Sequence, residues 1–265
     1  MGWANGEVER SLKSLVLLHA FPLDHRMWDG VADEIAKSGW QVFTPDFRGF
    51  GGAADWSDEQ PPSLRVLSED VLSLMNQFGI ETFVIGGCSL GGYVAMDLLR
   101  IAPERIAGAI FMDTKASADS IEQKENRLRV AKQVEDATTT EAFWRAMLPN
   151  VLGAFTTLNS PEIVQYTKAL MSQSRVNGVA NLQRAMSERE DSHKVIENFK
   201  GPILSLRGTE DTVATEVDHA NLMKVAQDGF HVNIENCGHL PPIEKPDETA
   251  KAVIDFLNQL ARPTC

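Results

Sequence analysis

The sequence predicts an α/β fold in which helices cover both faces of a mostly parallel sheet, and three observations support this prediction. Short continuous apolar runs such as Leu15–Leu18 alternate with amphipathic segments from the start of the chain, a pattern typical of buried parallel strands joined by helices. The 265 residues suffice for one large α/β domain, or for a core with an inserted subdomain. Hydrophobic residues at 43% and charged residues at 23% describe an ordinary globular protein.

The expected elements alternate along the chain. Strands are expected at residues 14–19, at Gln41–Thr44, in the run that leads into Ser89, at Ile106–Met112, at 202–208 and at His231–Ile234. Helices are expected across Trp28–Ser38, from Pro62 to near Gly79, from Ser89 to about Ala102, across Glu216–Gln227 and from about Pro246 to Ala261. Proline suits the first position of a helix, as at Pro62, and Pro103 ends the helix before it.

The alternation breaks between residues 115 and 199, where only helical patterns occur. Turn signals fall near Asn150, Asn159–Pro161 and Asn177–Gly178. We therefore expect an α/β core of residues 1–114 and 200–265, with an all-helical insertion between two strands of its sheet.

Charge and cysteine content limit the partners. The net charge of −12 argues against nucleic acids and anionic membrane surfaces, so a small molecule is the expected partner. Cys88, Cys237 and Cys265 form no CxxC pair and no metal-ligand spacing. Because no apolar run reaches transmembrane length and Leu15–Leu18 is too short for a secretory signal, we expect a reduced cytoplasmic protein without a metal. The oligomeric state has no signal in the sequence.

The candidate nucleophile is Ser89. An apolar run leads into Gly87-x-Ser89-x-Gly91, and a helical pattern starts at once, which is the strand–turn–helix context of a nucleophile elbow. The glycines allow the strand and helix backbones to pass close together. Cys88 occupies an x position and is expected to pack in the core. The alternative is a glycine-rich turn with an ordinary surface serine.

A nucleophilic serine needs a base, and the base needs an orienting acid. Among six histidines, His239 lies in a loop between the last strand and the last helix, at the sheet edge where such sites assemble. The alternative for His239 is a loop histidine that caps a helix. His231 and His219 fall in a strand and a helix, and His193 has polar neighbours in the insertion.

Two aspartates compete for the role of the acid. Asp211 and Asp113 each follow a strand, so both are expected at the same sheet edge. Asp211 gives the chain order Ser, Asp, His and is favoured, while Asp113 is an alternative that also suits a turn cap. Glu210 is a third, weaker candidate.

Five motifs complete the pattern: Leu17–Pro22, Asp46–Gly51, Gly87–Gly92, Gly208–Asp211 and Gly238–His239. In type and order they resemble those of α/β-hydrolases of the esterase, lactonase and haloperoxidase-like group, over nearly the whole chain except the insertion. The resemblance implies an oxyanion hole made by the backbone N–H groups of Phe21 and Leu90. It also implies that His19 is a hydrogen-bonding scaffold and not the base.

The chain departs from the family pattern twice. The family usually has His-Gly where this chain has His19-Ala20, so the backbone there must suit a Cβ. The family usually starts with a β-hairpin, but only Met1–Lys13 precede the first motif. We therefore expect this N-terminal hairpin to be shortened.

The insertion resembles the family's cap, which roofs the pocket. Its candidate lining residues are apolar or aromatic: Phe143, Trp144, Met147, Leu148, Tyr166, Leu170 and Met171. Any one of them also suits simple core packing. Trp144, Met147 and Tyr166, together with Phe21, are the predicted substrate-binding residues, and they indicate a mostly apolar pocket.

These features predict a serine hydrolase that needs no cofactor and cleaves a small, largely apolar carboxylic ester, thioester or lactone through an acyl-enzyme. The same triad serves carbon–carbon hydrolases, peptidases, perhydrolases and some lyases, which are the alternative. Haloalkane dehalogenases and epoxide hydrolases are disfavoured, because they need a carboxylate at Ser89. A non-catalytic ligand-binding protein is a third hypothesis, favoured only by the loss of glycine at Ala20.

Overall fold

Six parallel strands form one sheet in the computed structural model, which describes residues 13–57 and 59–260. The strand order is β2-β1-β3-β4-β5-β6. Their bounds are Ser14–Leu18 (β1), Gln41–Phe43 (β2), Phe83–Cys88 (β3), Ile106–Met112 (β4), Ile203–Gly208 (β5) and Gly229–Ile234 (β6). All described pairings are parallel, so the predicted α/β class with a parallel sheet is confirmed.

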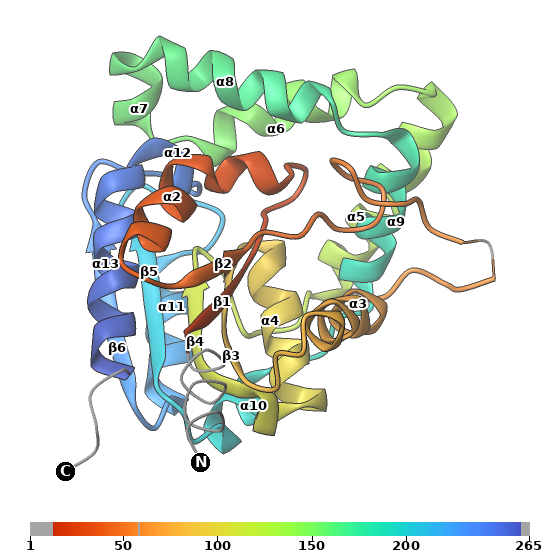
Figure 1. Ribbon diagram of the computed structural model, residues 1–265. Coiled ribbons are helices and arrows are strands. Elements are labelled where there is room, and N and C mark those ends of the chain that lie inside the picture. Colours follow the sequence, from red (N-terminus) through yellow and green to blue (C-terminus); the bar gives the residue numbers. More distant parts are fainter. Residues whose placement is uncertain (1–12, 58, 261–265) are drawn as a thin grey trace.

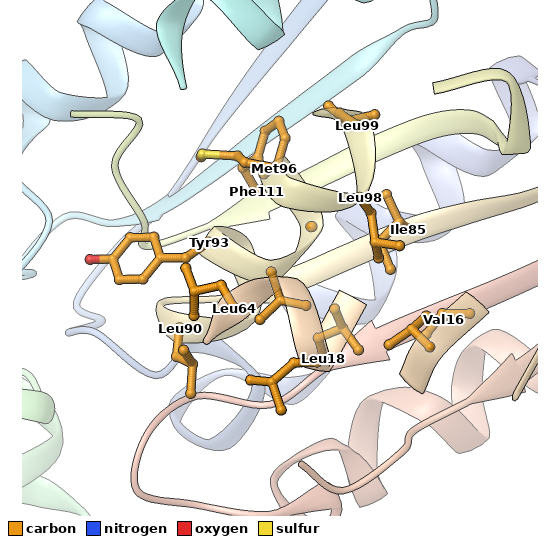
Figure 2. Close-up of a cluster of buried hydrophobic side chains, with 14 of the residues drawn as sticks. Val16, Leu18, Leu64, Ile85, Leu90, Tyr93, Met96, Leu98, Leu99 and Phe111 are labelled. Atoms are coloured by element: carbon orange, nitrogen blue, oxygen red, sulfur yellow. The ribbon is translucent and has the colours of Figure 1, made fainter. Parts of the chain in front are cut away.

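Helices cover both faces of this sheet (Figure 1). The core helices are η1 (His25–Trp28, a 3₁₀ turn), α2 (Asp29–Lys37), α3 (Leu64–Gln77), α4 (Leu90–Ile101), η2 (Pro103–Arg105, a 3₁₀ turn), α11 (Glu216–Val225), α12 (Pro241–Glu244) and α13 (Pro246–Leu260). Because side chains alternate along a strand, Val16 and Leu18 of β1 face a cluster with α3 and α4, which Figure 2 draws. Leu15 and Leu17 face the opposite cluster, with α2 and α13.

The start of α3 and the presence of α12 differ from what the sequence predicts. Pro62 lies before the helix and not in its first turn, because Ser63 is the N-cap of α3 and its hydroxyl accepts the Val66 N–H. A serine oxygen satisfies a free N–H of the first turn, so it decides where the helix begins. The four-residue helix α12 begins after His239 and its N-cap Leu240, and it was not expected.

The chain between β4 and β5 contains only helices among its secondary-structure elements, as expected. They are α5 (Ile121–Ala137), α6 (Glu141–Val151), α7 (Ala154–Asn159), α8 (Pro161–Ser172), α9 (Val176–Ser187) and α10 (His193–Asn198). In Figure 1, α6, α7 and α8 lie across the top of the molecule, and α5 packs against α9 at one side. We call α5 to α9 the cap helices.

The turn expected at Asn177–Gly178 is wrong, because both residues lie inside α9. Gly178 has a different reason to be glycine: a Cβ there would lie 2.4 Å from the carbonyl oxygen of Gly49. A cap helix and a core loop therefore touch backbone to backbone at this point.

Some expectations fall on residues outside those described. The shortened N-terminal hairpin concerns residues 1–12, and Cys265 lies beyond residue 260. Cys88 and Cys237 are both buried, as the packing role of Cys88 requires. No helix within residues 13–57 and 59–260 is both long enough and apolar enough to cross a bilayer.

Candidate active site

Ser89 is the single residue between β3 and α4, and its backbone is held in an uncommon conformation. Its φ of 52° and ψ of −111° lie where a residue with a Cβ is strained. Its N–H donates to the carbonyl of Met112 (2.9 Å), and its carbonyl accepts from the hydroxyl of Thr114 (2.8 Å). Ser89 is partly exposed, whereas Cys88 and Leu90 on either side are buried.

The glycines around Ser89 are required by close backbone contacts, as predicted. A Cβ on Gly87 would lie 2.1 Å from the carbonyl carbon of Gly91. A Cβ on Gly91 would lie 2.1 Å from the carbonyl oxygen of Leu18 in β1. Strand and helix therefore cross at a distance that only glycine permits, and this crossing holds Ser89 outward.

His239 and Asp211 come together at the same edge of the sheet. His239 lies in the loop between β6 and α12, and Asp211 follows β5. The Nδ1 of His239 and the Oδ2 of Asp211 are 2.9 Å apart, and both side chains are almost fully buried. Because Nδ1–H donates to the carboxylate, the remaining ring nitrogen, Nε2, carries the lone pair that a general base needs.

The three acids considered from the sequence have different partners. The Oε2 of Glu210 accepts the N–H of Phe155 in the cap, so this carboxylate is engaged elsewhere. The carboxyl group of Asp113 accepts the N–H of Gly208 at 3.0 Å. Asp113 nevertheless lies close to the pair, because one side-chain atom each from Asp113, Asp211 and His239 lie within 4.8 Å of one another.

The two buried aspartates have opposite pKa shifts. Burial and then the negative charge of Asp211 raise the pKa of Asp113 well above its usual range. Burial also raises the pKa of Asp211, but the charge of His239 and the hydrogen bonds from His239 and the Val213 N–H outweigh it. The pKa of Asp211 is therefore lowered, and Asp211 is the ionised member of the pair.

The backbone N–H groups of Phe21 and Leu90 donate to no other group among the described residues. Leu90 is the first residue of α4, where an N–H has no partner within the helix. The Phe21 loop is fastened by its neighbours. The N–H of Ala20 donates to the sulfur of Met27 (3.0 Å), and the Nε2 of His19 accepts the N–H of Phe47 (3.0 Å).

His19 is a scaffold in this geometry, as the resemblance implies. Its Nδ1 bonds to the carbonyl of Ala20 at 3.0 Å, so both ring nitrogens are engaged. Burial lowers the pKa of His19, which keeps the ring neutral. Ala20 is not among the described non-glycine residues with positive φ, so its Cβ fits without backbone strain.

The predicted substrate-binding residues lie in different surroundings. The ring centroids of Phe21 and Phe143 are 5.5 Å apart. Trp144 is buried in the α2/α13 cluster, while Tyr166 is 41% exposed and its hydroxyl donates to the carbonyl of Arg26. Met147 lines a cavity of about 540 Å³ together with Val130, Gln133, Val134, Ala137, Thr139, Ala142, Phe143 and Ala146.

Glu244 at the end of α12 was missed from the sequence. Its buried carboxylate accepts the N–H groups of Gly153 (2.8 Å), Gly238 (3.0 Å) and Leu240 (3.2 Å). The N–H of His239 donates to the carbonyl of Val151 (3.2 Å) at the end of α6. The histidine loop is thus fastened to the cap as well as to the core.

Two groups of side chains among the described residues are close enough to share a metal ion: Asp113 with Asp211 and His239, and Asp24 with His25 and Asp46. In the second group, the Nδ1 of His25 contacts both oxygens of Asp46, and Asp24 pairs with Arg26. Protein partners therefore engage both groups.

A further histidine is buried away from Ser89. The Nδ1 of His219 lies 2.7 Å from the hydroxyl of Ser205, and its Nε2 is buried without a partner among the described residues. Burial, and then the charge of His231, lower the pKa of His219 from 6.5 to about 4.

The parallel sheet, the serine turn and the histidine–aspartate pair together define an α/β-hydrolase. The family model of the alpha/beta hydrolase fold matches residues 13–246, and the chain belongs to this family. The resemblance noted in the sequence is therefore confirmed, and with it the class of enzyme.

Several known proteins are similar to this chain. A thermophilic esterase from Thermogutta terrifontis is 31% identical, with a TM-score of 0.89 over 94% of this chain and 90% of that one. The enol-lactonase from Burkholderia xenovorans LB400 is 24% identical, with a TM-score of 0.81 over 92% and 91%, and shows the fold alone. A pimeloyl-[acyl-carrier protein] methyl ester esterase of Aromatoleum aromaticum is 23% identical over 92% of this chain and 97% of its own length.

Proposed function

We propose that this α/β-hydrolase cleaves a small, largely apolar carboxylic ester, thioester or lactone through an acyl-enzyme. The observation that carries the proposal is the buried hydrogen bond of 2.9 Å between His239 Nδ1 and Asp211, at the same sheet edge as the partly exposed Ser89. An oriented base and an outward-held hydroxyl are the two requirements for acyl transfer by serine.

The proposed reaction has two halves. The Oγ of Ser89 attacks the carbonyl carbon while Nε2 of His239 takes its proton, and the N–H groups of Phe21 and Leu90 stabilise the oxyanion. Such donors lower the barrier by about 3–4 kcal/mol each. His239 then gives the proton to the leaving group, and the acyl group remains on Ser89. Water, deprotonated by His239, releases the acid and restores Ser89. No step needs a metal or an organic cofactor.

The apolar character of the substrate is supported by the cavity of about 540 Å³ between α5 and α6. None of its lining residues carries a formal charge, and only Gln133 and Thr139 are polar. Phe143 lines this cavity and also packs against Phe21, a proposed oxyanion donor. Ester cleavage is further supported by the 31% identical neighbour, which is described as an esterase.

The test is covalent labelling together with turnover. We expect a fluorophosphonate to label Ser89, and we expect Ser89→Ala to lose the label and to lower kcat for p-nitrophenyl butyrate by roughly 10³-fold or more. Ser63→Ala is the matched control, because the Ser63 hydroxyl caps α3 and should change neither readout. Full turnover by Ser89→Ala, or no labelling of the folded wild-type protein, contradicts the proposal.

A further inference from the structure

Two aspartates, and not one, end neighbouring strands beside His239. Asp113 follows β4 and Asp211 follows β5, and these strands pair through Met112 and Leu206. The backbone conformation of Asp113 is fixed by two features. Its N–H donates to the carbonyl of Leu206 at 3.0 Å, and its φ of 42° lies in the left-handed region. Asp113 is fully buried, and no part of the proposed reaction uses it.

A carboxylate oxygen of Asp113 lies within 4.8 Å of one of Asp211, and both side chains are buried. Two carboxyl groups this close can form a hydrogen bond only if one of them carries a proton. Two neighbouring buried carboxylates also repel each other strongly enough that one of them takes up a proton near neutral pH. The site therefore holds one carboxylic acid and one carboxylate.

The surroundings decide which aspartate holds the proton. The carboxylate of Asp211 accepts the N–H groups of Val213 (2.7 Å) and Ala214 (3.1 Å) as well as His239 Nδ1. Among the described residues, only the N–H of Gly208 donates a hydrogen bond to the carboxyl group of Asp113. Because donors stabilise the anion, the charge lies on Asp211 and the proton on Asp113, in agreement with their pKa directions.

We propose that Asp113 is a positioning residue, whose protonated carboxyl group donates a hydrogen bond to Asp211 and fixes the carboxylate that orients His239. This inference rests on the proposed function, since it assigns a partner to the same base. With neutral Asp113, the imidazolium formed during catalysis faces one negative charge and not two. Asp113 itself touches neither Ser89 Oγ nor a reacting atom in this proposal.

The decisive comparison is between Asp113→Asn and Asp113→Ala. Asparagine keeps a donor for Asp211 and a carbonyl acceptor for the Gly208 N–H, so kcat for p-nitrophenyl butyrate should stay within about threefold of wild type. Alanine removes both bonds, and kcat should fall about 10–100-fold, as for other partners of catalytic groups, with KM nearly unchanged. In Asp211→Asn, which removes the anion, kcat should fall by about 10⁴-fold.

The opposite ranking overturns the inference. If Asp113 is the ionised orienting acid, the kcat of Asp113→Asn falls as far as the kcat of Asp211→Asn. A loss in Asp113→Ala that Asp113→Asn shares equally also contradicts it. Near-UV circular dichroism identifies an alanine variant that has not folded, and the asparagine variant then decides alone.

The protonation state has a readout that does not depend on turnover. The infrared spectrum of the resting enzyme at pH 7 should contain the carbonyl band of a protonated carboxylic acid, and Asp113→Asn should remove it. If no such band is lost, the inference fails. If the band is present but no ester is cleaved and Ser89 is not labelled, the proposed function fails while the protonation of Asp113 stands.

Discussion

His219 is a buried histidine whose neutral form the fold requires. Its pKa falls from 6.5 to about 4 on folding, so the unfolded chain binds a proton more readily than the folded one. The stability that depends on neutral His219 is fully present above pH 6.5. It declines as the pH falls towards 4, where about 3 kcal/mol has been lost.

We therefore expect His219→Gln to lose less stability than wild type between pH 7 and pH 4, by about 2–3 kcal/mol. Urea unfolding at both pH values measures the difference. Lys224→Gln is the control, since Lys224 is exposed on the same helix, α11, and should keep the wild-type dependence. Equal pH dependence in wild type and His219→Gln contradicts the expectation.

Several residues of the proposed site could be predicted from the sequence because their patterns are local. Among the described residues, Ser89 is the serine that stands between a strand and a helix, and its flanking glycines follow from one crossing of backbones. The proton on Asp113 was not predictable, because it depends on how many donors face each of two aspartates. Glu244 was missed for a similar reason: three N–H groups converge on it only after the His239 loop has folded.

At the scale of elements, the turn between β3 and α4 depends on Gly91. A Cβ there would lie 2.1 Å from the carbonyl oxygen of Leu18 in β1. This oxygen belongs to the backbone of a sheet strand, so it cannot move aside alone. We expect Gly91→Ala to destabilise the protein by at least about 3 kcal/mol, measured by urea unfolding, and to abolish Ser89 labelling.

Gly52→Ala is the matched control for this substitution. A Cβ on Gly52 would meet its nearest atom, Oδ2 of Asp46, at 3.9 Å, which is ordinary contact, and its φ is not positive. Its effect should stay within about 0.5 kcal/mol. If the two alanine variants are equally stable, the close approach of the β1 and α4 backbones does not require glycine at position 91.

The order of strands and helices was predictable because the alternation of buried strands and amphipathic helices is strong. Asn177–Gly178 shows where such reasoning fails. A glycine needed for a contact with Gly49 has the same sequence signature as a glycine needed for a turn. Only the placement of α9 against the core separates the two.

At the scale of the whole molecule, the cavity between α5 and α6 is expected to set the preferred acyl length. Ala146→Trp introduces a large ring at its lining, so kcat/KM for p-nitrophenyl octanoate should fall about tenfold or more. The acetate ester, which has no chain to place there, should change less than twofold.

Ala169→Trp is the control for the cavity variant, because Ala169 is exposed on α8 and does not line this cavity. Its ratio of octanoate to acetate activity should equal that of wild type. An unchanged ratio in Ala146→Trp means that the acyl chain lies elsewhere.

The lining of the pocket was the least predictable feature of the molecule. Phe143, Trp144 and Met147 are neighbours in the sequence of one amphipathic helix, yet Trp144 is buried in the α2/α13 cluster and does not line the cavity, whereas Phe143 and Met147 do. The rotation of a helix about its axis is fixed by all of its contacts at once. Tyr166, exposed beside Arg26, illustrates the same point.

The fastening of the His239 loop has a consequence for exchanging caps between α/β-hydrolases. The natural place to cut is the boundary between cap and core, but here Val151 at the end of α6 accepts the His239 N–H, and Gly153, just before α7, donates to Glu244. A chimera carrying a foreign segment here would therefore change the contacts of the His239 loop even if every core residue were kept. In such an exchange, Val151 and Gly153 should be kept together with the His239 loop, although they lie among the cap helices.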